Sequence, residues 1–296
     1  MMSDMAIVGA GPSGLAMAIQ LKRYGLEPVV FERNQPGGLL WNANLVENYP
    51  GFPGGIPGPE LVKLIVDQAK EIGVKIVFEE ITSLDIKGDV FILRSGNQRY
   101  QYRWVAVASG TKPIQAIRSD IPAGAEKLIF YEVYPIIRQK WKKIVIVGAG
   151  DAAFDYALNL AWQNEVIILN RGSARACLPL LFDRMSDHPN ITYYQNIGVS
   201  EIDFDEPVKR LNLTCTSPAG MRKIVADYLI FAIGREPKLD FLTENLVEFQ
   251  KNLIESGRLY LIGDVKNEIY RQTAIAVGDG VLAAMKLYRS STENNP

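Results

Sequence analysis

A glycine-rich segment near the N-terminus has the residue types and spacing of a phosphate-binding loop. Gly9-Ala10-Gly11-Pro12-Ser13-Gly14 follows the apolar run Met5–Val8 and opens a stretch with helical spacing, Ser13–Tyr24. In the pattern Gly-x-Gly-x-x-Gly the first glycine permits a tight turn, the second lets the backbone approach a pyrophosphate, and the third lets helix and strand pack closely. The first turn of the helix then offers unpaired N–H groups and the positive end of its dipole to the phosphates.

An acidic residue stands where such a loop needs one. Glu32 ends a second predicted strand, Pro28–Glu32, and lies 18 residues after Gly14. At that distance a carboxylate accepts hydrogen bonds from the ribose hydroxyls of a dinucleotide. The loop and Glu32 together therefore predict a dinucleotide site in the first part of the chain.

A second phosphate-binding loop lies in the middle of the chain. Gly148-Ala149-Gly150-Asp151-Ala152-Ala153 has the form Gly-x-Gly-x-x-Ala. It joins a predicted strand, Lys143–Val147, to a predicted helix, Ala152–Trp162, and the strand Glu165–Leu169 follows. The repeated order of strand, loop, helix and strand predicts a second nucleotide fold.

The residues after the second strand of this repeat lean toward a phosphorylated nucleotide. Asn170 and Arg171 follow the strand, so no carboxylate stands where a site for NAD usually has one. Arg171 and Arg175 have forked donors that suit the 2′-phosphate of NADP.

Composition argues against several other classes of protein. The 296 residues carry 32 lysines and arginines against 33 aspartates and glutamates, and this balance argues against a nucleic-acid-binding surface. No apolar run reaches the roughly 18 residues of a membrane span, and the first residues have no basic stretch or cleavage site, so we expect a cytoplasmic protein. Two cysteines, Cys177 and Cys215, exclude a disulfide scaffold. With the single histidine His188, we expect no metal site.

The order of predicted elements indicates parallel β-α-β units. Between the two nucleotide folds, Ile76–Ile81 and Val90–Leu93 are expected to be antiparallel strands, and Trp104–Ala108 a buried strand. Thr111–Pro113 and Gly234–Pro237 are expected to be hinges, because the residue before a proline is driven to extended geometry.

These elements give an α/β fold class with two Rossmann-like three-layer dinucleotide-binding domains, the second inserted into the first. We expect residues 1–112 and 238–296 to form the first domain and residues 113–237 to form the second.

Further stretches resemble the low-molecular-weight thioredoxin reductases, and the resemblance covers nearly the whole chain. They are Glu47–Pro53, Ala108–Thr111, Phe231–Pro237, and Gly263–Val265 with Tyr270–Gln272. The resemblance implies FAD in the first loop and NADPH in the second. It also implies a homodimer, and an inserted domain that rotates to present the nicotinamide to the flavin.

The same resemblance implies which residues bind the cofactors. Asp264 resembles the acid that accepts from the ribityl chain, Asn48 the side-chain contact to the flavin, and Ile81 the backbone contact to adenine. A last helix starting at Arg271-Gln272-Thr273 would favour the negative charge that develops at the N1/O2 edge of the flavin. The whole set expected for FAD is Gly9, Gly11, Pro12, Ser13, Gly14, Glu32, Arg33, Gly38, Leu39, Asn48, Ile81, Gly110, Gly263, Asp264, Arg271, Gln272 and Thr273. The set expected for NADPH or NADH is Gly148, Gly150, Asp151, Ala152, Arg171, Arg175 and Gly234.

The chain departs from the family at its reactive centre. The family's chemistry needs a Cys-x-x-Cys just before the second loop, where one thiol attacks the substrate disulfide and the other passes electrons from the flavin. Alignment on the second loop puts Glu132-Val133-Tyr134-Pro135 there, which excludes thioredoxin reduction through an internal dithiol. Tyr131, Glu132 and Tyr134 would lie near the flavin, where they either shape an acceptor pocket and move protons or only pack.

Two smaller departures concern the cofactors. Leu39 stands where the family usually has a glutamine near the flavin, and the loss of that hydrogen bond alters the flavin potential. The family pattern His-Arg-Arg followed by Arg is reduced here to Asn170, Arg171, Gly172 and Arg175. Weak binding of NADPH, acceptance of NADH, and use of the site by another ligand or by none therefore stay open.

Three functions fit these residues. The first is an FAD-dependent oxidoreductase that passes electrons between NAD(P)H and an external acceptor, such as ferredoxin or flavodoxin, a quinone, a free flavin or a separate disulfide. The second is a flavoprotein that uses no nicotinamide and is reduced by ferredoxin or through a second flavin nucleotide in the second loop. The third is an FAD-binding protein without turnover.

Overall fold

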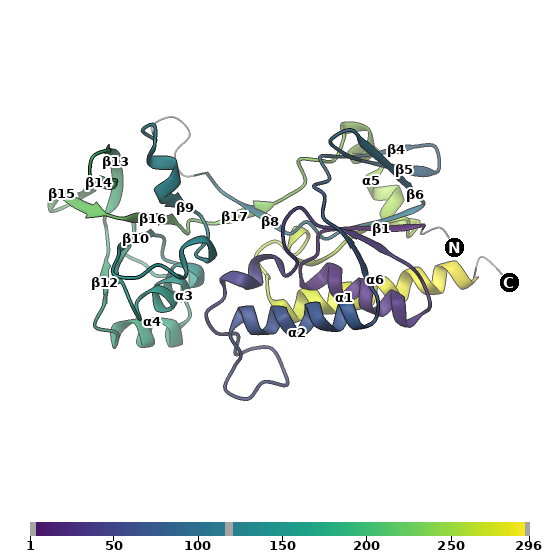
Figure 1. The fold of residues 1–296 in the computed structure, drawn as a ribbon, viewed down its shortest axis with the longest axis horizontal. Helices are drawn as coiled ribbons and strands as arrows, with labels where there is room; N and C mark the ends of the chain where they lie inside the picture. Colours follow the sequence, from purple (N-terminus) through teal and green to yellow (C-terminus); the bar gives the residue numbers. More distant parts are fainter. Residues whose placement is uncertain (1–3, 116–120, 294–296) are drawn as a thin grey trace. The chain divides into compact units, whose positions relative to one another are not determined.

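The computed structural model describes residues 4–115 and 121–293, and these form two α/β units (Figure 1). Unit 1 holds residues up to 41, residues 46–112 and residues from 236 onward, and unit 2 holds residues 42–45 and 113–235. The chain passes between the units through β8 (Thr111–Pro113) and β17 (Arg235–Pro237), which pair in a two-stranded sheet. Both strands fall in the segments expected to be hinges, Thr111–Pro113 and Gly234–Pro237.

The central sheet of unit 1 is parallel throughout. Its strand order is β18-β7-β1-β2-β3, and every neighbouring pair runs in the same direction. The loops after β1, β2, β7 and β18 therefore meet at one edge of the sheet, which is where ligands bind in doubly wound folds. The strands are β1 (Met5–Val8), β2 (Val29–Phe31), β3 (Lys75–Val77), β7 (Trp104–Val107) and β18 (Leu259–Leu261).

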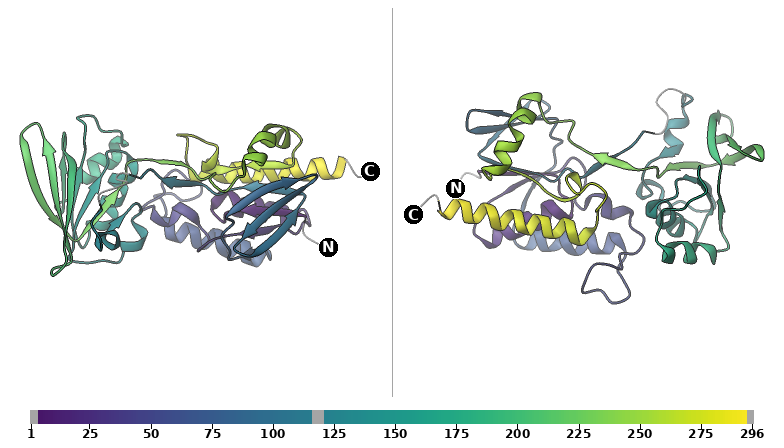
Figure 2. Two further views of the ribbon diagram at one scale, coloured as in Figure 1. Left: turned by 90° about the horizontal axis from the view of Figure 1, so that it is seen from above. Right: turned by 180° about the vertical axis from the view of Figure 1, so that it is seen from behind.

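Alternate residues of this sheet pack against different layers. Ala6 and Phe31 contact Phe91 and Leu93 of an antiparallel sheet, which covers one face together with helix α5. Helices α1, α2 and α6 lie side by side and form the other layer (Figures 1 and 2). The antiparallel strands are β4 (Ser83–Lys87), β5 (Val90–Ser95) and β6 (Gln98–Tyr102), and the helices are α1 (Pro12–Arg23), α2 (Gly58–Glu71), α5 (Glu244–Glu255) and α6 (Thr273–Glu293).

Unit 2 repeats this plan with a second parallel sheet. Its order is β12-β11-β10-β16-β9. Ile144 and Ile146 of β10 pack against helices α3 and α4, whereas Val145 faces Leu211 and Leu213 of an antiparallel sheet. The elements are β9 (Ile129–Phe130), β10 (Lys143–Val147), α3 (Asp151–Leu160), β11 (Glu165–Leu169), α4 (Pro179–Ser186), β12 (Ile191–Tyr194), β13 (Gly198–Asp205), β14 (Arg210–Ser217), β15 (Gly220–Ala226) and β16 (Tyr228–Phe231).

Short 3-10 segments complete the path of the chain. They are η1 (Gly38–Asn42), η2 (Ala125–Leu128), η3 (Tyr134–Ile136) and η4 (Gly263–Val265). In the part of the chain that the structure describes, no helix combines the length and the apolar character needed to cross a membrane.

The expected fold class is confirmed, but one strand pairing is wrong. Of the antiparallel strand expected at Ile76–Ile81, only the first two residues lie in a strand, β3, which pairs parallel to β2 with Val29 opposite Lys75. Helix α2 lies between these two strands in the chain, and a strand that returns through a helical crossover is parallel. The strand expected at Val90–Leu93 is β5, which is antiparallel to both of its neighbours.

Candidate functional site

The first glycine loop combines two glycines that packing requires with one that faces open space. Gly9 has φ +108°, and a Cβ there would collide with the carbonyl oxygen of Ala108, the residue directly after β7. A Cβ at Gly14 would collide with the carbonyl oxygen of Gly9. A Cβ at Gly11 would meet no atom within 4 Å, so the backbone here is free to approach a phosphate.

Glu32 is held beside this loop by backbone donors. Its two carboxylate oxygens accept hydrogen bonds from Ala10 N at 2.9 Å and from Asn34 N at 3.0 Å. A carboxylate accepts about four hydrogen bonds, so lone pairs remain for ribose hydroxyls. Glu32 also lines an open hollow at the edge of the sheet, together with Gly9, Arg33, Ile81, Ser109 and Lys238. The hollow thus brings together several residues that the sequence assigns to the adenosine half of FAD.

Two other predicted segments are placed against the same loop. Gly37 N donates to Ala10 O at 2.8 Å, and a Cβ at Gly38 would lie 3.3 Å from Gly11 Cα. The first residue of η1, Gly38, therefore lies against the glycine loop, and Leu39 is the next residue of η1. Gly110 has φ +63° at the end of β7, where its carbonyl oxygen accepts from Lys238 N at 3.0 Å.

The C-terminal segment contributes residues to unit 1 from far along the chain. Asn48 Nδ2 donates to Gln272 Oε1 at 2.8 Å, so two residues predicted to contact the flavin are in direct contact. Gln272 O accepts from Ala276 N at 2.9 Å in the first turn of α6, which begins at Thr273. Asp264 lies in η4, directly after Gly263.

The second glycine loop has the same geometry as the first. A Cβ at Gly148 would collide with the carbonyl oxygen of Ala232, the residue directly after β16. A Cβ at Gly150 would meet no atom within 4 Å. The chain after β11 lies against this loop, because Ala176 N donates to Ala149 O at 2.9 Å. Asp151 Oδ1 accepts from Leu178 N at 2.8 Å, and Ala152 follows it in the first turn of α3.

Asn170 organises the loop that carries the two predicted arginines. Its buried amide donates to Ala174 O and to Tyr193 Oη, both at 2.9 Å, and its oxygen accepts from Gly172 N at 3.0 Å. Arg171 is the next residue and is exposed. The guanidinium of Arg175 lies 3.7 Å from the ring centre of Phe182 on α4, a cation–π contact that restricts its side chain.

An ion pair lies in the segment predicted to align with the family's dithiol. Arg235 Nη2 lies 3.1 Å from Glu132 Oε1, and Asn42 Nδ2 donates to Glu132 Oε2 at 3.4 Å. Asn42 Oδ1 accepts from Tyr134 N at 3.0 Å. The ring of Tyr131 packs 5.8 Å from that of Phe231. Tyr131, Glu132 and Tyr134 therefore have contacts within unit 2, and their position near a flavin stays a prediction.

Neither cysteine has the surroundings of a reactive thiol. Cys215 is fully buried in β14, and Cys177 lies in the loop before α4. Burial raises the pKa of both thiols, and the charge of Asp151 raises that of Cys177 further. A raised pKa lowers the fraction of thiolate, which is the nucleophilic form.

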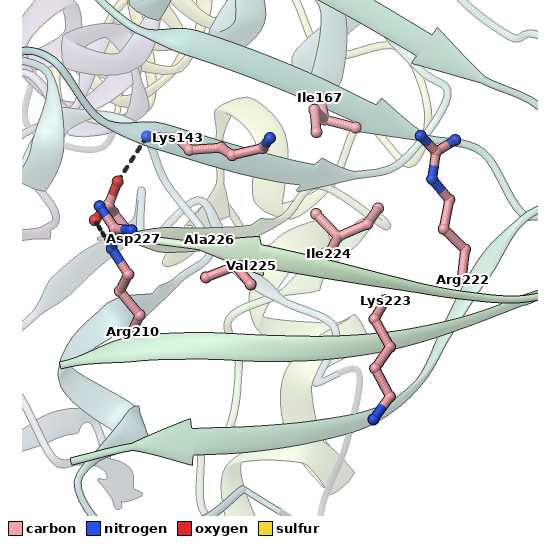
Figure 3. A pocket seen from close by; sticks show the side chains of 9 residues that line it. All are labelled: Lys143, Ile167, Arg210, Arg222, Lys223, Ile224, Val225, Ala226 and Asp227. Carbon is pink, nitrogen blue, oxygen red and sulfur yellow. Dashed lines mark hydrogen bonds and ion pairs between the residues drawn. The ribbon is translucent and has the colours of Figure 1, made fainter. Parts of the chain in front are cut away.

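Another hollow, in unit 2, is lined by none of the residues predicted to bind a cofactor. Lys143, Arg210, Arg222 and Asp227 line it beside Ile167 (Figure 3). Asp227 accepts from Lys143 N at 2.7 Å and from Arg210 Nε at 3.0 Å, so its charge serves the framework of β10 and β14. Among residues 4–115 and 121–293, no group of three or more potential metal ligands comes together.

Sequence reasoning missed two polar residues that shape these sites. The sequence indicates only the charge that Asn170 lacks, whereas its side chain makes two hydrogen bonds within the arginine loop and one to Tyr193 of β12. Asp279 on α6 binds the turn that contains Asp264. An acidic residue inside a helix gives no signal in the sequence that distinguishes it from a solvated surface charge.

Comparison with known proteins defines the class. The family model described as pyridine nucleotide-disulphide oxidoreductase matches residues 3–280, so the chain belongs to this family. It is an FAD-dependent oxidoreductase of the thioredoxin reductase type, a group whose members use FAD and NADPH.

Individual relatives agree with this class over the full length of the chain. A thioredoxin reductase of Chlamydia pneumoniae is 30% identical, with 97% of this chain and 98% of the relative covered. One of Spironucleus barkhanus is 31% identical, with 98% and 99% covered. The solved thioredoxin reductase of T. acidophilum has a TM-score of 0.83 at 26% identity, with 98% of both chains covered. The bacillithiol disulfide reductase Bdr of Staphylococcus aureus shares the fold, with a TM-score of 0.71 at 18% identity and 99% of both chains covered.

Proposed function

We propose that this protein takes electrons from NAD(P)H through FAD and passes them to an acceptor outside the chain, without an internal dithiol. The observation that carries the proposal is the Glu132–Arg235 ion pair at the position of the family's Cys-x-x-Cys. We further propose that it acts as a cytoplasmic homodimer, as the resemblance to thioredoxin reductases implies.

The residues of unit 1 suit FAD. The open position at Gly11 and the N-terminus of α1 suit a pyrophosphate, and Glu32 suits the ribose of the adenosine half. The Asn48–Gln272 pair and Asp264 suit the flavin half. Bound FAD supplies the ability to accept a hydride and to release electrons singly or in pairs.

Other residues of unit 1 would influence the charge and the potential of the flavin. The positive end of the α6 dipole lies at the start of the helix, at Thr273. It favours negative charge on a group bound beside the segment Arg271–Thr273. Leu39, beside the first loop, offers no hydrogen bond to a ring, so we propose a flavin potential different from that of relatives with glutamine there.

The residues of unit 2 suit NADPH better than NADH. The strand end carries the neutral Asn170 in place of the carboxylate that binds the ribose of NAD. Two of its side-chain hydrogen bonds lie within the loop, and the third goes to Tyr193 of β12. Arg171 and Arg175 are the cations available for a 2′-phosphate, and the contact with Phe182 restricts Arg175 before binding.

The lack of reactive thiols supports an external acceptor. Thiol–disulfide exchange needs an attacking thiolate and a partner sulfur. Glu132 and Pro135 supply neither, and Cys177 and Cys215 lie in different elements with raised pKa values. The acceptor must therefore react with the flavin directly.

Anaerobic reduction of the purified protein tests the proposal. We expect NADPH to bleach the flavin absorption and ferricyanide or a quinone to restore it with turnover, whereas a thioredoxin disulfide restores nothing. The variants Cys177→Ser and Cys215→Ser should keep the full rate, because neither sulfur takes part.

The alternatives give different results in the same experiment. If reduced ferredoxin bleaches the bound FAD and neither NADPH nor NADH does, the result would favour the second function, a flavoprotein that uses no nicotinamide. Bound FAD that no donor reduces would leave a binding protein. Turnover with thioredoxin, abolished in Cys177→Ser, would contradict the proposal.

A further inference from the structure

We propose that Asp279 is a positioning residue, which holds the turn of Asp264 against the phosphate loop so that the flavin half of FAD binds in register with the ADP half. The inference rests on the proposed binding of FAD by unit 1. It concerns a residue on α6 that belongs to no motif of the family resemblance.

Asp279 ties down both ends of the turn. Its Oδ2 accepts from Gly263 N at 3.1 Å and from Asn267 Nδ2 at 2.6 Å, and its Oδ1 lies 2.8 Å from Lys266 Nζ. The 3-10 segment between these partners, Gly263–Val265, contains Asp264. The side chain of Asp279 is only 13% exposed, so these bonds are weakly screened by solvent.

The same stretch of α6 lies against the first glycine loop. A Cβ at Gly280 would collide with the carbonyl oxygen of Ser13, and a Cβ at Gly263 would lie 2.5 Å from Ser13 Oγ. Gly263 also has φ +74°, a conformation that favours glycine. Ser13 therefore contacts both the turn and the helix, while Asp279 joins the turn to the helix.

This junction connects two distant parts of the sequence that the proposed cofactor must span. The ADP half would rest on the loop of Gly11 and on Glu32, whose own partners are Ala10 N and Asn34 N. The ribityl and flavin half would depend on the turn of Asp264. The loss of Asp279 would free the turn without altering the donors that hold Glu32, so its effect should be confined to the flavin half.

Affinities of the apoprotein for FAD and for ADP test this separation. We compare Asp279→Ala, Asp279→Asn and the control Lys266→Ala, which removes one partner of Asp279 and leaves both hydrogen bonds of Oδ2. Flavin fluorescence quenching gives the dissociation constant of FAD, and calorimetry gives that of ADP. Asp279→Ala should weaken FAD about tenfold and ADP less than about twofold, since a hydrogen bond to a charged group is involved.

The conservative variant and a double variant sharpen the test. Asp279→Asn keeps one oxygen acceptor, so it should recover part of the affinity for FAD. Asp264→Ala with Asp279→Ala should bind FAD no more weakly than Asp264→Ala alone, because residues that act through one another are not additive.

Each remaining outcome is decisive. Unchanged FAD affinity in Asp279→Ala, or equal weakening of FAD and ADP, overturns the positioning role. A wild-type apoprotein that binds ADP but not FAD, or neither, overturns the proposed function itself. Wild-type binding of both ligands with equal affinities in all variants overturns only this inference.

Discussion

Arg235 and Glu132 form an ion pair of 3.1 Å in the segment that we expect to align with the dithiol of the thioredoxin reductases. Arg235 begins β17, and its side chain is 18% exposed against 35% for Glu132. Both are therefore partly withdrawn from water, where a charge without its partner is costly. The pair thus joins the start of β17 to the segment predicted to align with the family's redox centre.

Removal of Glu132 should destabilise the protein. For Glu132→Ala we expect the free energy of unfolding to fall by about 1–2 kcal/mol, between the values for surface and buried pairs, because Arg235 loses this ion pair. Glu132→Gln should lose less, since its oxygen still accepts from Asn42. Urea unfolding of both variants beside the exposed control Glu206→Ala measures the effect. Equal stability of Glu132→Ala and the control would show that the pair contributes nothing.

Replacement of Glu32 should lower the affinity for FAD. Glu32→Ala loses both the ribose acceptor and the bonds to Ala10 N and Asn34 N, so we expect about tenfold weaker binding or more. The flavin content of the purified protein and titration of the apoprotein measure it, with Glu27→Ala as the control in the same unit. Full FAD occupancy in Glu32→Ala would remove Glu32 from the ribose site.

The fold followed from the sequence wherever glycine spacing and buried strands carry the signal. Both glycine loops fall between the expected strand and helix. Only glycine fits at Gly9 and Gly148, because a Cβ there would collide with the residue that follows the neighbouring strand. Helix α2 was missed, since a segment rich in glycine and proline precedes it. The missed helix also explains the wrong direction expected for β3, because apolar periodicity gives no strand direction.

The site could be predicted only where a motif is local. The contact of Asn48 with Gln272 spans 224 residues, and the resemblance placed both residues at the flavin without showing that they touch. The three bonds of Asp279 and the role of Asn170 depend on helix and loop placement that no spacing encodes. Likewise, the alignment predicts that Glu132 stands in place of a cysteine but not that Arg235 pairs with it.

Arg171 should determine the choice between the two nicotinamide cofactors. Arg171→Ala should raise the KM for NADPH about tenfold and leave that for NADH nearly unchanged, because only NADPH carries the 2′-phosphate. Steady-state kinetics with both cofactors measure the ratio, and Arg222→Ala, whose guanidinium lies 4.4 Å from the ring centre of Tyr194, is the control. Equal effects on both cofactors would show that Arg171 does not contact a 2′-phosphate.

Asp85 should make the stability of unit 1 depend on pH in the acid range. Hydrogen bonds from Asn245 and from Thr243, the N-cap of α5, hold the pKa of Asp85 below its ordinary value. A carboxylate with a lowered pKa stabilises the fold above its unfolded pKa and loses this effect as the pH falls through the folded value.

The measurement compares wild type with Asp85→Asn, which keeps an oxygen acceptor but cannot ionise. We expect the difference in free energy of unfolding to be constant above about pH 5 and to shrink below about pH 4, where Asp85 takes up its proton. Urea unfolding from above about pH 5 to below about pH 4 follows it, with Asp67→Asn on the half-exposed face of α2 as the control. Curves for wild type and Asp85→Asn that stay parallel down to the lowest pH would contradict this role, because the bonds to α5 would then not depend on the charge of Asp85.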